Sequence, residues 1–116
     1  MAAFRVYLVI LFVSLGAYTL VVGLNHGWNL IPVFFADISA MAWPGQFNFD
    51  FLTFLTLSAF WLAWRHRFTP GGIALGVLGF FGGMMVLAPY LIWASLEAKG
   101  DVKVLLLGSE RAAALV

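Results

Sequence analysis

Hydrophobic residues along the chain gather into three long runs separated by short polar segments. The first run, residues 4–24, contains only small or weakly polar interruptions, and the second, residues 46–65, starts polar and ends in basic residues. The third run, residues 72–96, is rich in glycine. A helix needs about 20 apolar residues to cross a bilayer, and each run supplies roughly that number. The pattern predicts an all-α, polytopic membrane protein with three transmembrane helices.

The segment between the first two runs, residues 30–42, is apolar but too short to span a bilayer. Asn29 lies where an N-cap is expected, and Pro32 falls in the first turn of the helix that would follow. We expect a short interfacial helix here. The tail, residues 97–116, is expected to form another interfacial helix or a partly frayed end, so that residues 1–116 make a single membrane domain.

Composition agrees with this interpretation, because 64% of the 116 residues are hydrophobic and only 9% are charged. A soluble domain of this size has too much surface to hide so many apolar side chains, whereas a bilayer solvates them. The net charge of +1 offers no basic field for nucleic acid. The absence of cysteine excludes disulfides, thiolate nucleophiles and cysteine-ligated metals.

The second run is short for a transmembrane helix. Its purely apolar part, residues 51–64, would extend roughly 21 Å, against a hydrocarbon core of about 30 Å. Either the bilayer thins locally, or the helix draws Asn48 and Asp50 below the headgroups. A carboxylate at that depth is costly unless it is protonated, hydrated or hydrogen-bonded, so we expect Asp50 to face inward.

Four glycines in the third run, Gly72, Gly76, Gly79 and Gly83, are spaced by 4, 3 and 4 residues and form one bare helical stripe. Such a stripe lets another helix approach closely, because no side chain intervenes. It predicts tight helix packing, with a partner either in this chain or in a neighbouring copy. Further along, Pro89 removes one backbone donor and is expected to kink the helix.

The distribution of charge sets the expected topology. With three spans, Arg5 and the basic triplet Arg65-His66-Arg67 lie on one side of the membrane, which the positive-inside rule makes cytoplasmic. The N-terminus is then cytoplasmic and the C-terminus outside, although basic residues in the tail argue against this arrangement. A cleaved signal peptide is the alternative for the first run, and the continuation of that run beyond the expected cleavage point disfavours it.

The basic triplet has two interpretations. The simpler one is a topology anchor at the headgroup level, and the alternative is a site for anionic lipid headgroups. His26 and His66 fall on opposite sides of the membrane under this topology, so the two histidines are not expected to share a ligand.

A polar cluster of His26, Asp37, Asn48 and Asp50 is expected at the outer end of the helices. A histidine with two carboxylates can bind a cation or act as acid and base, yet no metal-ligand spacing accompanies them. The simpler interpretation is that these groups cap helices and satisfy each other's hydrogen bonds. We therefore expect no catalytic residue, no metal and no cofactor.

Several short motifs are shared with a known family: Phe34-Phe35-Ala36-Asp37, Phe49-Asp50-Phe51, a basic cluster after Trp64, and a glycine-rich helix ending at Pro89-Tyr90. Over most of residues 4–96 the chain resembles a family of small bacterial membrane proteins known only as a domain of unknown function. It departs from that family at residues 65–67, where an acidic residue is expected. The resemblance implies an inner-membrane location and carries no functional residues across.

Three functions follow as hypotheses. The first is a non-enzymatic inner-membrane protein that acts as an oligomer or as an accessory subunit of a larger complex, packing through the glycine stripe. The second is a small carrier or channel formed by oligomers, with Asp50 facing the path. The third is a membrane enzyme, or a protein that binds a lipid or isoprenoid, using the outer polar cluster.

Overall fold

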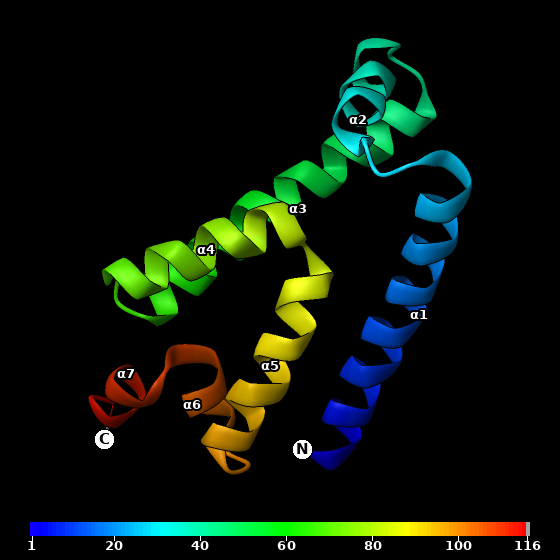
Figure 1. Ribbon diagram of the computed structural model, residues 1–116. Helices are drawn as coiled ribbons and strands as arrows, with labels where there is room; N and C mark the ends of the chain where they lie inside the picture. The colour runs from blue at the N-terminus through cyan, green and yellow to red at the C-terminus, as the bar shows by residue number, and fades with distance from the viewer. Residues whose placement is uncertain (116) are drawn as a thin grey trace.

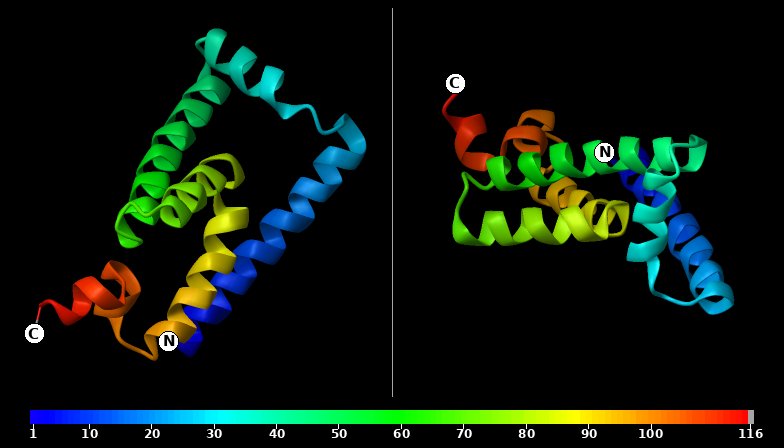
Figure 2. Two further views of the ribbon diagram at one scale, coloured as in Figure 1. Left: turned by 60° about the vertical axis from the view of Figure 1, so that its left-hand side comes forward. Right: turned by 90° about the horizontal axis from the view of Figure 1, so that it is seen from above.

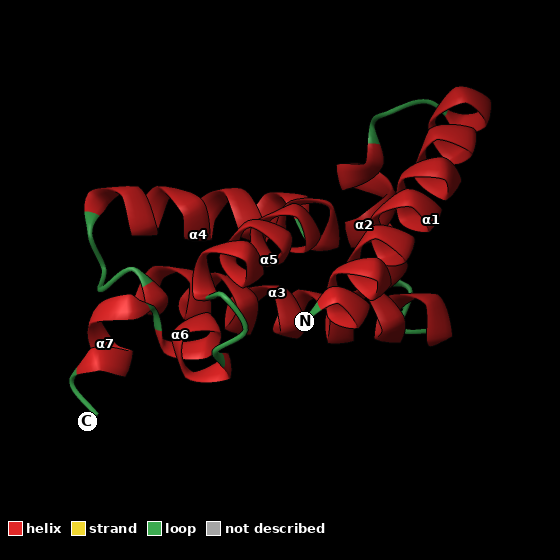
Figure 3. Ribbon diagram, turned by 90° about the horizontal axis from the view of Figure 1, so that it is seen from below, coloured by secondary structure: helices red, strands yellow, loops and turns green. Residues whose placement is uncertain are grey.

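The computed structural model describes residues 1–115, which form helices and no strand (Figure 1). The predicted all-α class is confirmed. In chain order the helices are α1 (Ala2–His26), α2 (Leu30–Ser39), α3 (Trp43–Arg65), α4 (Pro70–Gly82), α5 (Met84–Ala98), α6 (Val102–Leu107) and α7 (Ser109–Ala113). The molecule is elongated, with principal extents of 50 × 27 × 24 Å. Figure 3 shows that only short loops connect the helices.

Two helices, α1 and α3, are long and apolar enough to cross a membrane, with mean hydropathies of 2.2 and 1.2 over their most apolar stretches. Only 11% and 6% of the residues in these stretches are buried within the protein. The core helix of a soluble protein would be mostly buried, because apolar side chains avoid water. These two helices therefore favour a membrane location, and the three predicted spans are not confirmed.

The predicted third span, residues 72–96, is not one helix. Gly83 has φ 58° and ψ −137°, and it ends α4 and begins α5. Glycine reaches this backbone conformation without steric cost, because it lacks a Cβ. The kink expected at Pro89 stays a prediction: α5 continues through Pro89, and the break in the helix lies at Gly83. Figure 2 shows α4 lying beside α3 and α5 turning back along α1.

The start of α1, the end of α3, the second half of α5 and α6 meet at one end of the molecule. The buried residues there are Leu62, Tyr90, Ala94, Ala98 and Leu105, with Met1 and Phe4 packed against them. Figure 1 shows the two chain termini at this same end. The predicted placement of the termini on opposite sides of a membrane required a continuous third span, and it is not confirmed.

The glycine stripe packs against α3 of the same chain. A Cβ added to Gly76 would lie 2.8 Å from the carbonyl oxygen of Ala59, and one added to Gly79 would lie 2.5 Å from Cδ1 of Leu62. A Cβ added to Gly72 would lie 2.6 Å from the Cβ of His66, just after α3. A Cβ added to the fourth glycine, Gly83, would lie 3.1 Å from Cζ of Phe51. The stripe's partner is therefore within the chain, and no observation supports its use between copies.

The ends of the shorter helices follow local sequence signals. Helix α2 forms where the interfacial helix was predicted but ends at Ser39, and the side chain of Asn29 makes no capping hydrogen bond. Helix α3 begins at Trp43 because Pro44 is accommodated in its first turn. The tail, where a frayed end was one expectation, contains two helices. Asp101 caps α6 by accepting a 2.9 Å hydrogen bond from the Lys103 amide.

Candidate functional site

The predicted outer cluster is only partly assembled. The Asn48 side-chain amide donates to the Phe34 carbonyl at 3.2 Å and to a carboxylate oxygen of Asp37 at 3.4 Å. These bonds tie α3 to α2. His26 and Asp50 are exposed, and neither side chain makes a hydrogen bond or ion pair within residues 1–115. No group of three potential metal ligands occurs in that part of the chain. The part of the cluster that is assembled therefore holds α3 against α2.

A cavity of about 630 Å³ lies at the other end of the molecule, between the α3–α4 turn, the end of α5, and the segment from α6 to α7. Its polar lining includes three arginines, a histidine and two glutamates: Arg65, His66, Arg67, Glu97, Glu110 and Arg111. Thr69 and Ser109 add hydroxyl groups, and Trp93 adds an aromatic wall. The predicted topology anchor thus forms one wall of a charged cavity.

Arg65 is the buried member of this wall, with 7% of its surface exposed. Its Nε donates to the Leu105 carbonyl at 2.8 Å and its Nη2 to the Val104 carbonyl at 3.2 Å. These carbonyls belong to the last turn of α6, where a helix leaves acceptors available to outside donors; the Val104 carbonyl also accepts from the Gly108 amide at 2.9 Å. Trp61 donates to the Leu106 carbonyl at 3.1 Å in the same way. Arg65 and Trp61 therefore attach α6 to α3.

Within residues 1–115 the charge of Arg65 has no carboxylate counter-ion. Its third hydrogen bond goes from Nη1 to the Tyr90 hydroxyl at 2.8 Å, so all three of these partners are neutral oxygens. Among the described residues the one ion pair within 4.0 Å joins Arg67 and Glu110. A buried cation without an anion carries a desolvation cost that neutral partners repay only in part. Such a group, lining a cavity, favours an anionic occupant.

His66 shares the Tyr90 hydroxyl with Arg65. The distance from His66 Nε2 to the Tyr90 oxygen is 2.6 Å. Because Arg65 can only donate to that oxygen, the hydroxyl hydrogen is free to donate to Nε2, which places the proton of a neutral imidazole on Nδ1. Burial lowers the pKa of His66 below 6.5, the Arg65 charge lowers it further, and Glu97 acts in the opposite direction. The ring also stacks on Trp93, with centroids 6.5 Å apart.

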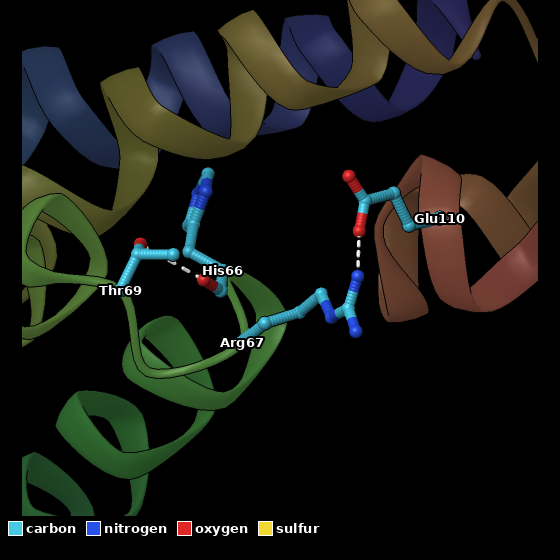
Figure 4. A network of polar contacts seen from close by, with 4 residues as sticks. All are labelled: His66, Arg67, Thr69 and Glu110. Carbon is cyan, nitrogen blue, oxygen red and sulfur yellow. Dashed lines mark hydrogen bonds and ion pairs between the residues drawn. The ribbon is translucent and has the colours of Figure 1, made fainter.

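Helix α7 forms the outer wall of the cavity through surface contacts. Arg67 reaches across to Glu110, and Figure 4 shows this ion pair bridging the turn after α3 and the C-terminal helix. Both side chains are largely exposed, at 60% and 68%. Arg111 lies over the ring of Trp64, 4.1 Å from its centroid. Exposed ion pairs contribute only about 0–1 kcal/mol, so this wall is held much less firmly than α6.

Sequence reasoning identified residues 65–67 as a unit but missed the separate roles of its members. Arg65 is the last residue of α3 and is buried, whereas Arg67 lies in the following turn with φ 59° and faces solvent. The tail was expected on the other side of the membrane, which hid its contact with the triplet. Tyr90, noted in the sequence only as part of the Pro89-Tyr90 motif, contacts both Arg65 and His66.

The lining combines guanidinium groups, hydroxyls and an imidazole N–H, which are the usual donors to a phosphate group. The two glutamates keep the cavity from being uniformly positive, and one of them is already paired with Arg67. No known protein family, curated protein or solved structure matches this chain, so the suggested family resemblance gains no support there.

Proposed function

We propose that this is a non-enzymatic integral membrane protein that binds the phosphate-bearing headgroup of an anionic lipid in the cavity at its basic end. The observation that carries the proposal is Arg65: a buried guanidinium that pairs with no carboxylate among residues 1–115, lining a cavity whose other arginines are Arg67 and Arg111. An anionic headgroup would supply the missing negative charge, and its acyl chains would remain in the surrounding bilayer.

The fold supports a specific arrangement in the membrane. In this proposal α1 and α3 span the bilayer, whereas α4 and α5 form a hairpin that enters from the basic side and turns back at Gly83. Helices of 13 and 15 residues extend only about 20–22 Å, which is less than the roughly 30 Å hydrocarbon core. Both chain termini then lie on one side, as the shared buried cluster favours.

This arrangement also accounts for the basic residues of the tail, which argued against an outside C-terminus in the three-span topology. All six basic residues lie in the first two turns of α1, at the end of α3 and its following turn, or after α5: Arg5, Arg65, Arg67, Lys99, Lys103 and Arg111. They therefore share one side, which the positive-inside rule assigns to the cytoplasm of an inner membrane. Anionic lipids of the cytoplasmic leaflet would lie at the level of the cavity.

Cysteine labelling tests the topology, because the chain has no cysteine of its own. Asn25→Cys and Ala113→Cys lie at the two ends of the molecule and are exposed. We expect a membrane-impermeant maleimide added to intact cells to label the cysteine at position 25 and to leave that at position 113 unlabelled until the membrane is opened. Equal access to both in intact cells would refute the hairpin arrangement.

Lipid binding is tested by native mass spectrometry of the detergent-solubilised protein with phosphatidylglycerol or phosphatidylcholine. We expect selective retention of phosphatidylglycerol, weakened about tenfold in Arg111→Gln because one charge-assisted contact is lost. Lys103→Gln is the matched control: it removes the same charge from the same end but lies outside the cavity lining. Equal effects of the two substitutions, or no lipid selectivity, would refute a site and leave only a diffuse surface charge.

The subunit and carrier hypotheses remain predictions. The glycine stripe is covered by α3, so an oligomer would need another surface. Asp50, proposed to face a transport path, is exposed on α3. The native mass recorded in the lipid experiment also reports whether copies associate.

A further inference from the structure

We propose that His66 takes up a proton when a phosphate-bearing headgroup occupies the cavity, so that the headgroup is held more tightly as the pH falls. This inference rests on the proposed lipid binding and adds its regulation. It starts from the geometry of three side chains: Arg65 and His66 both contact the Tyr90 hydroxyl, at 2.8 and 2.6 Å, and Arg65 and His66 both line the cavity.

The hydrogen bonds of Tyr90 fit a neutral His66. Arg65 is always a donor, so the Tyr90 oxygen accepts from it and leaves the hydroxyl hydrogen free to donate to His66 Nε2. Proton uptake at Nε2 makes this nitrogen a donor to the same Tyr90 oxygen, which has two lone pairs and can accept from both neighbours. The network therefore accommodates both charge states, with only the hydroxyl hydrogen turning away.

Charges facing the ring decide between these states. Burial opposes protonation most, followed by Arg65 from α3. Two further cations line the cavity, Arg67 from the following turn and Arg111 from α7, whereas α6 contributes only apolar residues. Glu97 from α5 favours protonation, and Glu110 from α7 is already paired with Arg67. A phosphate among these cations would add further negative charge and shift the balance toward the imidazolium.

Thermodynamic linkage between proton binding and headgroup binding gives the sign of the pH effect on affinity and relates its size to the pKa shift. If the occupied cavity raises the pKa of His66 by about one unit, protonated protein binds the headgroup about tenfold more tightly than neutral protein. The change falls between the pKa values of the empty and occupied states, the first of which lies below 6.5. A phosphodiester headgroup does not titrate in this range, so the pH dependence would belong to the protein.

The chain offers its own control, because it has two histidines and they lie at opposite ends. In nanodiscs, NMR of isotope-labelled histidine follows both rings as phosphatidylglycerol replaces phosphatidylcholine. Negative surface potential raises the pKa of any histidine near an anionic bilayer, and His26 reports that general effect. We expect the pKa of His66 to rise about one unit more than that of His26. Equal shifts of the two rings would overturn the proposal.

Binding measured at about pH 5.5 and pH 8 completes the test. Wild type is expected to retain phosphatidylglycerol more tightly at the lower pH, by up to about tenfold, and His66→Gln is expected to show no pH dependence. His26→Gln should behave as wild type. Glycerophosphoglycerol, the same headgroup without acyl chains, shows whether the lipid or its soluble phosphodiester is the ligand. Selective binding that is equal at both pH values overturns the proton linkage alone, whereas no selective binding at either pH overturns the proposed function.

Discussion

Replacing Gly76 with alanine tests the packing of α4 on α3, which positions the wall of the cavity. The added methyl group would lie 2.8 Å from the Ala59 carbonyl oxygen, whereas ordinary contact begins at 3.4 Å. Because the obstacle is backbone, it cannot rotate aside, and the two helices must separate by about 0.6 Å, the difference between these distances.

The magnitude follows from two opposing terms. Forcing a methyl group into a closely packed interface costs about 1–3 kcal/mol, while alanine is more favourable than glycine within a helix by about 0.5–1 kcal/mol. We expect a net loss of about 1–2 kcal/mol in the free energy of unfolding for Gly76→Ala. Gly71→Ala is the matched control, because its Cβ would meet nothing within 4 Å and only the favourable term remains.

Gly79→Ala should fall between these two variants. Its methyl group would meet Cδ1 of Leu62, the end of a flexible side chain, but Leu62 is fully buried and has little room to move. Thermal unfolding in detergent, followed by circular dichroism, gives the order of stability. The expected order is Gly71→Ala at or above wild type, then Gly79→Ala, then Gly76→Ala. If Gly76→Ala unfolds at the same temperature as Gly71→Ala, the proposed packing against Ala59 is wrong. If Gly76→Ala changes the native mass without changing the unfolding temperature, the stripe makes contacts between copies instead.

Four further outcomes follow from the same contacts. Arg65→Met removes three hydrogen bonds that attach α6 and Tyr90 but also relieves the desolvation cost of the guanidinium, so it should lower the unfolding free energy measured in detergent by about 1–3 kcal/mol. Glu110→Gln breaks an exposed ion pair and should change that energy by less than about 1 kcal/mol. Asn48→Ala should cost about 1 kcal/mol and, in hydrogen exchange, loosen α2 selectively. Folding lowers the pKa of His66, so the unfolded chain binds the proton more readily than the folded one. The contribution of His66 to stability is therefore full above about pH 6.5 and falls as the pH drops toward the lower pKa of the folded state. His66→Gln should flatten this part of the plot of melting temperature against pH.

The sequence was sufficient for the helical class and for the two long helices, because runs of apolar residues report length and hydrophobicity directly. It was insufficient for the third run. One continuous helix and two half-length helices have the same hydropathy, and the difference lies in the backbone of Gly83. The Gly82-Gly83 pair is a recognised turn signal that could have suggested the break. It was obscured by the regular glycine spacing, which is also that of a helix-packing stripe.

The candidate site was harder to predict than the fold. Arg65 recognises carbonyls in the last turn of α6, and backbone acceptors leave no mark in an amino-acid sequence. The outer cluster, in contrast, was suggested by residue type alone, and only the contact of Asn48 with Asp37 and its helix is present. Residue type therefore predicted the outer cluster poorly. The contact that does build the cavity joins the basic end of α3 to α6, which is distant in the sequence.

The hairpin explains why burial is uneven along the two long helices. Helices α4 and α5 cover α3 and α1 near the basic end, where Leu8, Leu62 and Arg65 are buried. Beyond the turn at Gly83 they provide no cover, and Leu24 of α1 is 72% exposed. Such an apolar surface is unfavourable in water but costs nothing against lipid chains. The packing energy is therefore concentrated around the cavity, and an anionic lipid bound there would stabilise the part of the molecule on which the whole fold depends. Unfolding in phosphatidylglycerol should consequently require a higher temperature than unfolding in phosphatidylcholine, by an amount that Arg111→Gln reduces and Lys103→Gln does not.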